Sequence, residues 1–393
     1  MDKLTKPQLK KLASEMLHLE RKLHTEGTLT DEEHSRLQRL HSAHGGGLFD
    51  SIKEWIFNMS GFEENEISKN ANGGTEIAKR KLASIIDPEL LDNFQIICSR
   101  PRELEKDKIR IFWAHDLAED PESQKFRDKE FQDSFHKFVF ISNWQYQRYQ
   151  LIHGLPYDTK SVVLESGIEP APEGVHAMKD GDKIRLVYTS TPQRGLDILV
   201  AVFEKLAETQ KDIHLDVFSS FKLYGWEEMD KQFEPLYDRI RNHPQMTYHG
   251  FVPNQDVKDH LNKSHIFAYP CTWIETSCRA MLESMSAGLI CVHPNLGALP
   301  ETSGGLNIMY HGDWDNKEHH ANIFINHLNS AIQFVRDKNH GAMASFNKVF
   351  VDSRYNIDRI KSQWTVMLED LLHKYPNVES RGIPKKQFVY RTI

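Results

Sequence analysis

The chain has 393 residues, with 49 Lys or Arg against 56 Asp or Glu, which gives a formal net charge of −7. A hydrophobic fraction of 39% beside 27% charged residues excludes wholesale disorder, a collagen-like repeat and a coiled-coil rod. The mild acidity argues against nonspecific nucleic-acid binding as the main task, and the length predicts two domains.

Cysteine usage and the lack of long apolar stretches indicate the compartment. The four cysteines form no CxxC pair and no dense framework, so neither a structural zinc site nor a disulfide-stapled secreted domain is predicted. The first residues lack the apolar core of a signal peptide, and no stretch approaches the ~18 apolar residues of a membrane span. We therefore expect a soluble, cytoplasmic protein without a transmembrane segment. The 21 histidines are many for this length.

Residues 1–47 predict a helical hairpin that extends the N-terminus. Apolar residues recur at helical spacing between Leu9 and Leu23, and Thr30 with Glu33 has the spacing of a capping box that starts a second helix. Three consecutive glycines then end the hairpin as a hinge. Its apolar stripe favours packing on the first domain, while dimerisation or capture of another molecule through the hairpin stays open.

From residue 48 onward, short apolar runs alternate with helical patterns, which is typical of parallel sheets covered by helices. A stretch rich in turn formers near residues 169–182 separates two such series. We predict an α/β protein with two Rossmann-like parallel-sheet domains, 48–178 and 179–375, which face each other across a cleft, and a tail, 376–393, that packs back on the first. The predicted strands are 55–59, 94–98, 109–113, 138–142, 162–164, 184–188, 215–218, 246–248, 266–269, 289–292 and 306–309, and the clearest helical patterns open at Gly74 and span 321–335 and 357–372.

A loop in the second domain carries candidate binding residues. Ligands of parallel sheets bind beyond the carboxyl ends of strands, where loops lead into helix N-termini. After the strand at 266–269 we expect a helix that begins near Glu275, so that the N–H groups of residues 276–278 suit a phosphate or another anion. Glu283 would lie about 12 Å from Glu275 along this helix, which suits two hydroxylated parts of one extended ligand. An amphipathic helix with two solvated glutamates explains the same spacing.

At this point the chain resembles the retaining, nucleotide-sugar-dependent glycosyltransferases of family 4, which have the GT-B fold. Their signature is a Glu, seven residues, a second Glu, a small-residue turn, a strand and a Gly-x-x-Pro-Glu segment. The resemblance covers roughly residues 50 to 375 and leaves the hairpin outside. The matching positions are Glu275, Glu283, Ala287-Gly288, 289–292, Gly297 and Pro300-Glu301.

Further matches are spread over both domains, with two departures. The family usually has an additional basic residue about five positions before Arg194, where Thr189-Ser190 stands here, and Ser166 replaces a common Asn. The remaining matches are Gly73-Gly74-Thr75-Glu76 as the first glycine-rich loop, His115-Asp116 after a strand, Ser142-Asn143-Trp144 as a helix start, Arg194-Gly195 as a basic residue before a helix, and His249-Gly250-Phe251-Val252-Pro253 near the nucleotide base.

The resemblance implies metal-independent transfer of a hexosyl or pentosyl group from a nucleotide sugar to a hydroxyl acceptor, with retention at the anomeric carbon. The nucleotide sugar is then a co-substrate, no cofactor is expected, and the acceptor is a glycan, as in glycan biosynthesis. His115 would touch the donor sugar, Glu275 would hold its hydroxyls, and Arg194 would stabilise the leaving nucleoside diphosphate. The rest of the implied donor site is Gly73, Gly74, Thr189, Ser190, Gly250, Phe251, Val252, Thr276, Ser277, Cys278 and Glu283.

Other functions stay open as alternatives, and no metal site is predicted. Asp180-Gly181-Asp182 and Asp313-Trp314-Asp315 fit an Asp-x-Asp pattern but fall where turns are expected. The alternatives are glycosylation of a hydroxylated DNA base, a GT-B-fold sugar-nucleotide epimerase or phosphorolytic enzyme, and an inactive binding or scaffold protein. Missing Gly-x-Ser-x-Gly, Walker and GxGxxG patterns argue against hydrolases, ATPases and dehydrogenases.

Overall fold

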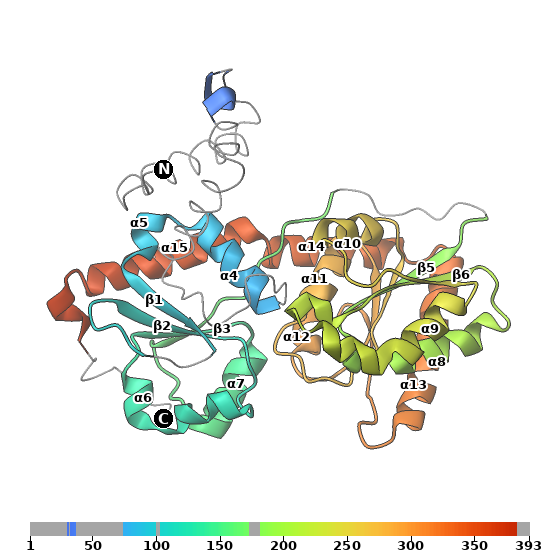
Figure 1. Cartoon of the computed structure of the whole chain (residues 1–393), viewed down its shortest axis with the longest axis horizontal. Helices are drawn as coiled ribbons and strands as arrows, with labels where there is room; N and C mark the ends of the chain where they lie inside the picture. Colours follow the sequence, from blue (N-terminus) through green and yellow to red (C-terminus); the bar gives the residue numbers. More distant parts are fainter. Residues whose placement is uncertain (1–29, 31, 37–73, 100–102, 173–180, 383–393) are drawn as a thin grey trace.

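Figure 1 shows the computed structural model, in which two α/β units lie side by side. It describes residues 30, 32–36, 74–99, 103–172 and 181–382. The predicted strand at 55–59 and most of the predicted hairpin therefore lie outside the described residues. Inside the hairpin the capping box is confirmed, because Thr30 N–H donates to the Glu33 carboxylate at 2.9 Å and Glu33 N–H donates to Thr30 Oγ1 at 3.2 Å.

The first domain is built on a four-stranded parallel sheet with helices above and below it (Figure 1). Its first two strands are buried at every position, which explains why they appear in the sequence as continuous apolar runs. The sheet order is β1 (Phe94–Cys98), β2 (Ile109–Ala114), β3 (Lys137–Phe140) and β4 (Ser161–Val163), and the helices are α4 (Gly74–Ile85), α5 (Pro88–Leu91), η2 (Pro121–Arg127), α6 (Lys129–Asp133) and α7 (Asn143–His153).

The second domain has a six-stranded parallel sheet in the order β10-β9-β8-β5-β6-β7. The chain winds outward from β5 in one direction and then returns to its other side with β8, so the switch point lies between these two strands. Ligands of open sheets bind outside the carboxyl ends of strands at such a point. The strands are β5 (Ile184–Thr189), β6 (Ile213–Phe218), β7 (Met246–Tyr248), β8 (Ile266–Ala268), β9 (Ile290–Pro294) and β10 (Ile308–Tyr310).

Helices of the second domain cover both faces of this sheet, and short 3-10 helices follow β5 and β6. Every strand predicted within the described residues is therefore found, with ends that differ by a few residues. The helices are η3 (Pro192–Arg194), α8 (Leu196–Ala207), η4 (Phe221–Tyr224), η5 (Glu227–Phe233), α9 (Glu234–Asn242), α10 (Asn254–Leu261), α11 (Arg279–Ser286), α12 (Leu299–Ser303), α13 (Lys317–Arg336) and α14 (Gly341–Arg354).

Helix α15 (Ile357–Lys374) crosses back to the first domain, whereas the predicted boundary assigned residues up to 375 to the second. Its buried stripe of Ile360, Trp364, Leu368 and Leu371 belongs to the same core as β1 and β2. The stripe predicts an amphipathic helix but does not indicate which sheet the helix covers. The sequence therefore does not show that the second domain ends before α15. Residues 376–382 also lie on the first domain, where Arg381 donates to the Asp107 carbonyl at 2.9 Å.

Several of the numerous histidines are buried polar members of the folded core. His136 accepts a hydrogen bond from the backbone N–H of Arg110 at 2.9 Å, and a His293 ring nitrogen lies 2.9 Å from the carbonyl of Pro294. Burial lowers the pKa of each of these two imidazoles to about 4, so both are neutral near pH 7. Part of the histidine excess is therefore structural.

Trp364→Ala should destabilise the protein by about 3–5 kcal/mol, because it empties a large buried site between α15 and the first sheet. Val366 on the same helix is 65% exposed, so Val366→Ala should cost about 0.5 kcal/mol or less. Urea unfolding followed by circular dichroism measures both. Equal costs would contradict the docking of α15 on the first domain.

Folding stability should fall as the pH drops from 7 to 5. Burial lowers the pKa of His115 to about 3 and those of His136 and His293 to about 4, against about 6.5 in an unfolded chain. Below pH 6.5 the unfolded chain therefore binds more protons, which lowers the free energy of unfolding by up to about 1.4 kcal/mol per pH unit for each histidine. Urea unfolding at several pH values measures this slope.

His293→Asn should reduce that slope by up to about 1.4 kcal/mol per pH unit, which corresponds to one proton. His373→Gln, at an exposed position of α15, should leave it unchanged. A free energy of unfolding that stays constant from pH 7 to pH 5 would contradict the neutral state of the buried histidines.

Candidate active site

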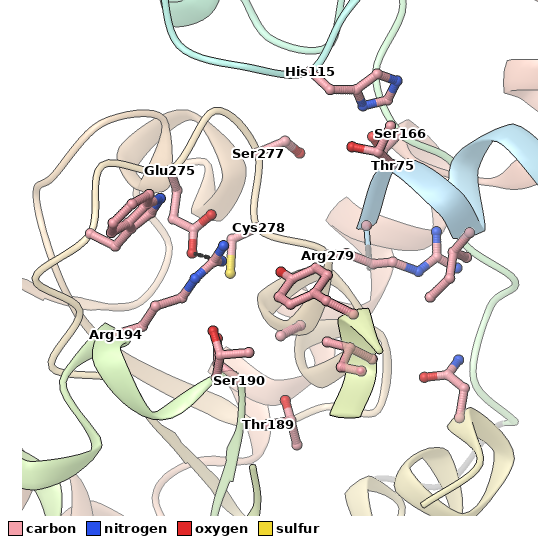
Figure 2. A pocket seen from close by; sticks show the side chains of 18 of the residues that line it. Thr75, His115, Ser166, Thr189, Ser190, Arg194, Glu275, Ser277, Cys278 and Arg279 are labelled. Atoms are coloured by element: carbon pink, nitrogen blue, oxygen red, sulfur yellow. Dashed lines mark hydrogen bonds and ion pairs between the residues drawn. The ribbon is translucent and has the colours of Figure 1, made fainter. Parts of the chain in front are cut away.

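A cavity of about 1350 Å³ opens where the two domains face each other, and both domains line it. Single small-molecule sites usually measure about 300–1,000 Å³, so this one has room for two substrates. Figure 2 shows side chains of both domains around it. Gly73 lies outside the described residues, and every other predicted site residue lines this cavity: Gly74, His115, Thr189, Ser190, Arg194, Gly250, Phe251, Val252, Glu275, Thr276, Ser277, Cys278 and Glu283.

The close approach of two loops at the switch point positions Arg194. The loop after β5 ends in Arg194 and Gly195, and it packs against the loop after β8. Gly195 has a φ of 96°, and a Cβ there would lie 2.1 Å from the carbonyl oxygen of Pro270. Only glycine allows this contact. The contact brings Arg194 beside the loop that carries Glu275.

A partly buried ion pair forms the centre of the site (Figure 2), in which the Arg194 side chain is 22% exposed and the Glu275 side chain 6% exposed. Arg194 Nη1 lies 2.6 Å from Glu275 Oε1, and the hydroxyl of Tyr269 donates to the same oxygen at 2.6 Å. Although burial opposes the charge, Glu275 keeps the pKa of Arg194 well above its usual value. The guanidinium therefore provides a fixed positive charge in the cavity.

A second glycine holds the backbone of Glu275 in place. Gly297 has a φ of 59°, and a Cβ there would lie 2.6 Å from the carbonyl oxygen of Glu275 and 2.8 Å from its nitrogen. The next residue, Ala298, donates its N–H to the Glu275 carbonyl at 2.8 Å. Gly297, which the sequence matched to the family signature, thus fixes the first glutamate of that signature.

The helix expected near Glu275 begins four residues later, so that prediction is wrong. Helix α11 starts at Arg279 with Cys278 as its N-cap residue, and Glu275 lies on the preceding loop. The bond from Ala298 holds the Glu275 carbonyl outside any helix, and Thr276 uses its hydroxyl on the other domain. The separation of about 12 Å along one helix therefore does not apply. The N–H groups at the N-terminal end of a helix are here those of α11, from Arg279 onward.

His115 lies on the first-domain side of the cavity, directly after β2, across from Arg194 and Glu275 (Figure 2). Its carbonyl accepts a hydrogen bond from Thr276 Oγ1 at 2.9 Å, which joins the two domains. Burial lowers the pKa of His115 to about 3. Its Nε2 atom has no hydrogen-bond partner among the described residues. A neutral ring with a free nitrogen suits a hydroxyl group better than a phosphate.

Other buried polar atoms on the cavity wall also lack a hydrogen-bond partner among the described residues. Thr189 Oγ1, Arg194 Nε and Ser219 Oγ are buried, and none of them bonds to another atom in the part of the chain that the structure describes. Folded proteins rarely leave such groups unsatisfied. Together with His115 Nε2 they indicate a polar ligand that touches both domains.

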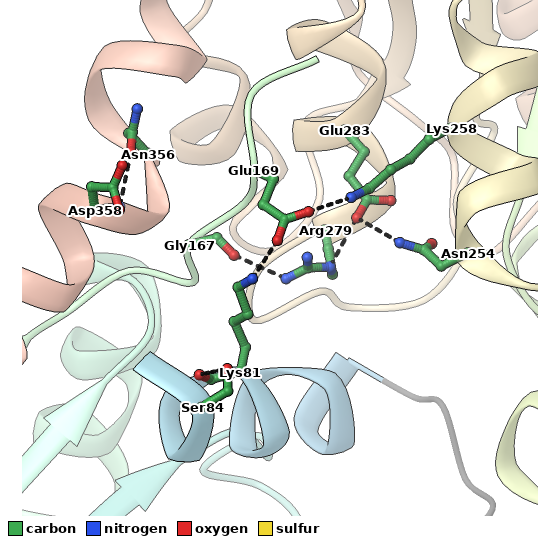
Figure 3. Close-up of polar contacts among 10 residues, drawn as sticks. All are labelled: Lys81, Ser84, Gly167, Glu169, Asn254, Lys258, Arg279, Glu283, Asn356 and Asp358. Atoms are coloured by element: carbon green, nitrogen blue, oxygen red, sulfur yellow. Dashed lines mark hydrogen bonds and ion pairs between the residues drawn. The ribbon is translucent and has the colours of Figure 1, made fainter. Parts of the chain in front are cut away.

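Glu283 belongs to a polar network that the sequence interpretation missed (Figure 3). Its Oε1 accepts from Arg279 Nε at 3.0 Å and lies 3.4 Å from Asn254 Nδ2. Arg279 also donates to the carbonyl of Gly167, in the linker between the domains, at 3.0 Å. An arginine four residues before a glutamate on a helix is a sequence signal that could have identified this pair.

The linker is also held by charges from both domains. Lys81 of α4 and Lys258 of α10 both pair with Glu169, the latter at 3.1 Å (Figure 3). The lysines, first of all Lys81, lower the pKa of the Glu169 carboxyl to about 2. Lys81 lines the cavity, so this cluster borders the site.

The motifs considered for metal binding are accounted for in part. Asp313 accepts hydrogen bonds from the N–H groups of Asp315 and Asn316, as a turn residue does, while Asp180 lies outside the description. Across the described ranges, no group of three or more His, Cys, Asp or Glu side chains is arranged to hold a metal ion. None of the helices described is both long and apolar enough to cross a membrane.

The sequence of the second domain is similar to those of known glycosyl transferases. Residues 175–321 match the family model described as Glycosyl transferases group 1. One subunit of the human phosphatidylinositol N-acetylglucosaminyltransferase is 25% identical over 142 residues, which are 35% of this chain. The match spans only 28% of the length of that curated relative. The second domain thus contains a region similar to group 1 glycosyl transferases.

Solved structures extend the likeness to both domains. A glycosyltransferase from Rickettsia africae ESF-5 gives a TM-score of 0.59 at 16% identity and covers 84% of this chain and 88% of its own. The pneumococcal O-GlcNAc transferase GtfA, solved in complex with UDP and GlcNAc, gives 0.54 at 11% identity, covering 68% and 53%. The resemblance to GT-B glycosyltransferases is therefore confirmed at the level of the fold.

Gly297→Ala should cost more stability than Gly154→Ala, although the two glycines have similar φ angles of 59° and 65°. Alanine at either position carries the strain of left-handed backbone, about 1–2 kcal/mol. At 297 the new Cβ would also meet the Glu275 backbone, which should add about 1–3 kcal/mol, whereas nothing lies within 4 Å at 154. Urea unfolding compares the two variants. Equal losses in the free energy of unfolding would show that the Glu275 loop moves away from the new Cβ at little cost.

Proposed function

We propose that this chain, which has a GT-B fold and resembles group 1 glycosyl transferases in its second domain, is a retaining glycosyltransferase. It transfers a hexosyl or pentosyl group from a nucleotide sugar to a hydroxyl acceptor, and a glycan is the acceptor that we propose. The observation that carries the proposal is the cavity between the domains, where the Arg194–Glu275 pair faces His115 and unpartnered polar atoms come from both sides.

The donor would bind mainly to the second domain. Its diphosphate would lie near the Arg194 guanidinium and the N-terminal ends of α4 and α11, where N–H groups and a fixed cation favour negative charge. Glu283, held by Arg279, would bind the ribose hydroxyls. The loop at Gly250, Phe251 and Val252 would border the base.

The transferred sugar would lie between His115 and Glu275. Arg194 and Tyr269 both occupy Glu275 Oε1, which leaves Oε2 to accept hydrogen bonds from sugar hydroxyls. The neutral His115 ring offers Nε2 to another hydroxyl. The acceptor would then enter from the first-domain side of the cavity.

Transfer would need no nucleophile from the protein. The bond between the anomeric carbon and the phosphate oxygen breaks, and its electron pair leaves with the nucleoside diphosphate. The acceptor oxygen forms the new bond on the same face, and its proton passes to the leaving phosphate oxygen. Burial raises the pKa of the nearby Cys271 thiol to about 12 and raises that of the Cys278 thiol well above its usual value, so neither is a thiolate in this scheme.

The charge that develops on the leaving group would be met by Arg194 and by helix-end N–H groups. This supports transfer without a metal, and no cofactor besides the nucleotide sugar is part of the proposal. We also propose that the enzyme acts in the cytoplasm. Dimerisation through the N-terminal hairpin stays a prediction, since most of that segment lies outside the described residues.

A panel of UDP-, GDP-, ADP- and CDP-linked sugars, assayed by calorimetry and by donor consumption with and without oligosaccharides, tests the proposal. Binding of one donor and acceptor-dependent release of its nucleoside diphosphate is the expected result. An isomerised sugar nucleotide without acceptor would instead identify an epimerase. Absence of binding by every donor would favour a scaffold protein.

Glu275→Gln and Arg194→Ala should each lower transfer at least about 100-fold, because each removes a group that contacts the transferred sugar or the leaving diphosphate. Steady-state kinetics measures the loss, and circular dichroism checks that the variants stay folded. Arg239→Ala is the matched control, since it breaks an ion pair with Glu204 on the protein surface. Near-full activity of either site variant would remove that residue from the site.

A further inference from the structure

Segment 297–301 connects the Glu275 loop with the other domain. At its first end, Gly297 and Ala298 fix the backbone of Glu275. At its far end, in α12, the Glu301 carboxylate reaches the N-terminus of α7 in the first domain. The sequence singled out Glu301 only as the last residue of the family signature, and the proposed function gives it no role.

Glu301 caps α7 from across the cleft. Its Oε1 accepts hydrogen bonds from the backbone N–H of Asn143 at 2.9 Å and from Asn143 Nδ2 at 2.7 Å, and its Oε2 accepts from the N–H of Trp144 at 2.8 Å. Ser142 Oγ takes the next N–H of the helix, that of Gln145, at 3.0 Å. The other domain thus supplies the partner for two N–H groups that α7 cannot satisfy itself.

The first turn of α7 in turn holds the loop that carries His115. Gln145 is fully buried, and its Nε2 donates to the carbonyl of Asp116, the residue after His115, at 2.9 Å. Its Oε1 accepts from the N–H of Ile141 at 3.0 Å, which fixes the side chain. A shift of the α7 N-terminus would therefore move the His115 loop with it.

We propose that Glu301 is a positioning residue for sugar transfer. By capping α7 from the second domain, it holds the His115 loop in register with Glu275, so that the two halves of the site meet. On the cavity side, the hydrogen bond from Thr276 Oγ1 to the His115 carbonyl is a second contact that joins the His115 loop to the Glu275 loop. The inference rests on the proposed function for its effect on transfer, while its structural part is independent of it.

One further charged group faces the Glu301 carboxylate. Arg354 Nη2 lies 3.8 Å from Glu301 Oε1 and 2.9 Å from Glu165 Oε1, which is its nearer partner. The Arg354–Glu165 pair also joins the two domains and stays intact when Glu301 is replaced. We therefore expect a Glu301 variant to fold and to lose the register of the cleft.

The structural part is tested without any ligand. Spin labels at Lys129→Cys on α6 and Lys231→Cys on η5, whose native side chains are 71% and 74% exposed, report the distance between the domains. The four native cysteines are buried and stay unlabelled. Pulsed dipolar spectroscopy should give one narrow distance distribution for the parent protein and a broader, shifted one for Glu301→Ala.

Matched variants sharpen this measurement. Glu301→Gln keeps one oxygen acceptor and loses the other together with the charge, so it should give an intermediate distribution. Asn143→Ala removes one of the three hydrogen bonds and should give a small change in the same direction. Glu318→Gln, at an exposed position of the second domain, should change nothing. A distribution in Glu301→Ala that equals that of the parent protein would overturn the proposal.

The catalytic part is tested by steady-state kinetics with the donor selected from the panel. Glu301→Ala should lower kcat at least about tenfold and leave the donor KM within about twofold, since the donor binds mainly to the second domain. A raised donor KM with unchanged kcat would overturn the positioning role. If the parent protein transfers no sugar from any donor, the proposed function fails, and the distance measurement still decides whether Glu301 sets the register.

Discussion

The partly buried ion pair of Arg194 with Glu275 is the constraint on which the site depends. Removing two charges from water costs several kcal/mol, so such a pair persists only where its geometry and hydrogen bonds are fixed by the surroundings. Tyr269 supplies one of these bonds. Gly195 and Gly297 let the two flanking loops approach closely enough to align the charges. The pair therefore explains why glycines with positive φ stand at both positions.

The same pair sets the electrostatics of a cavity in an acidic protein. Among the other cations on the cavity wall, Lys81 pairs with Glu169 and Arg279 pairs with Glu283. Arg194 pairs with Glu275, so each of these three cations lies beside a carboxylate. The N–H groups at helix ends add a contribution to anion binding that is short-ranged and directional.

The sequence predicted the sheets well and the local geometry of the site less well. Parallel strands buried on both faces are nearly continuous apolar runs, and every predicted strand within the described residues is present. The start of α11 was misplaced because a carbonyl of Glu275 bonded to Ala298, twenty-three residues away, is invisible in local propensity. For the same reason the target of α15 could not be predicted, since its apolar stripe fits either sheet.

The residues predicted for the site lie around one cavity, because the signature that the sequence resembles links positions that the fold brings together. Their partners were missed where the contact is specific to this chain, as with Arg279 and Glu283. Long-range contacts between domains, such as Glu301 with α7, leave no periodic trace in a sequence. The sequence shows which residues have the chemistry to bind a ligand, and the structure shows which neighbouring groups hold these residues in place.

The arrangement of the cavity suggests a consequence of having Thr189 and Ser190 where the resembled family has a basic residue. Where the family that the sequence resembles has a second basic residue, this chain has hydroxyls, and Thr189 Oγ1 is buried with no partner among the residues described. A hydroxyl donates one hydrogen bond and carries no charge, so in the proposed mechanism it would orient a phosphate oxygen without adding to its attraction. Arg194 would then provide the fixed positive charge next to the proposed leaving group, and its alignment would matter more than beside a second cation. This dependence explains why three separate contacts, from Tyr269, Gly195 and Gly297, converge on one ion pair.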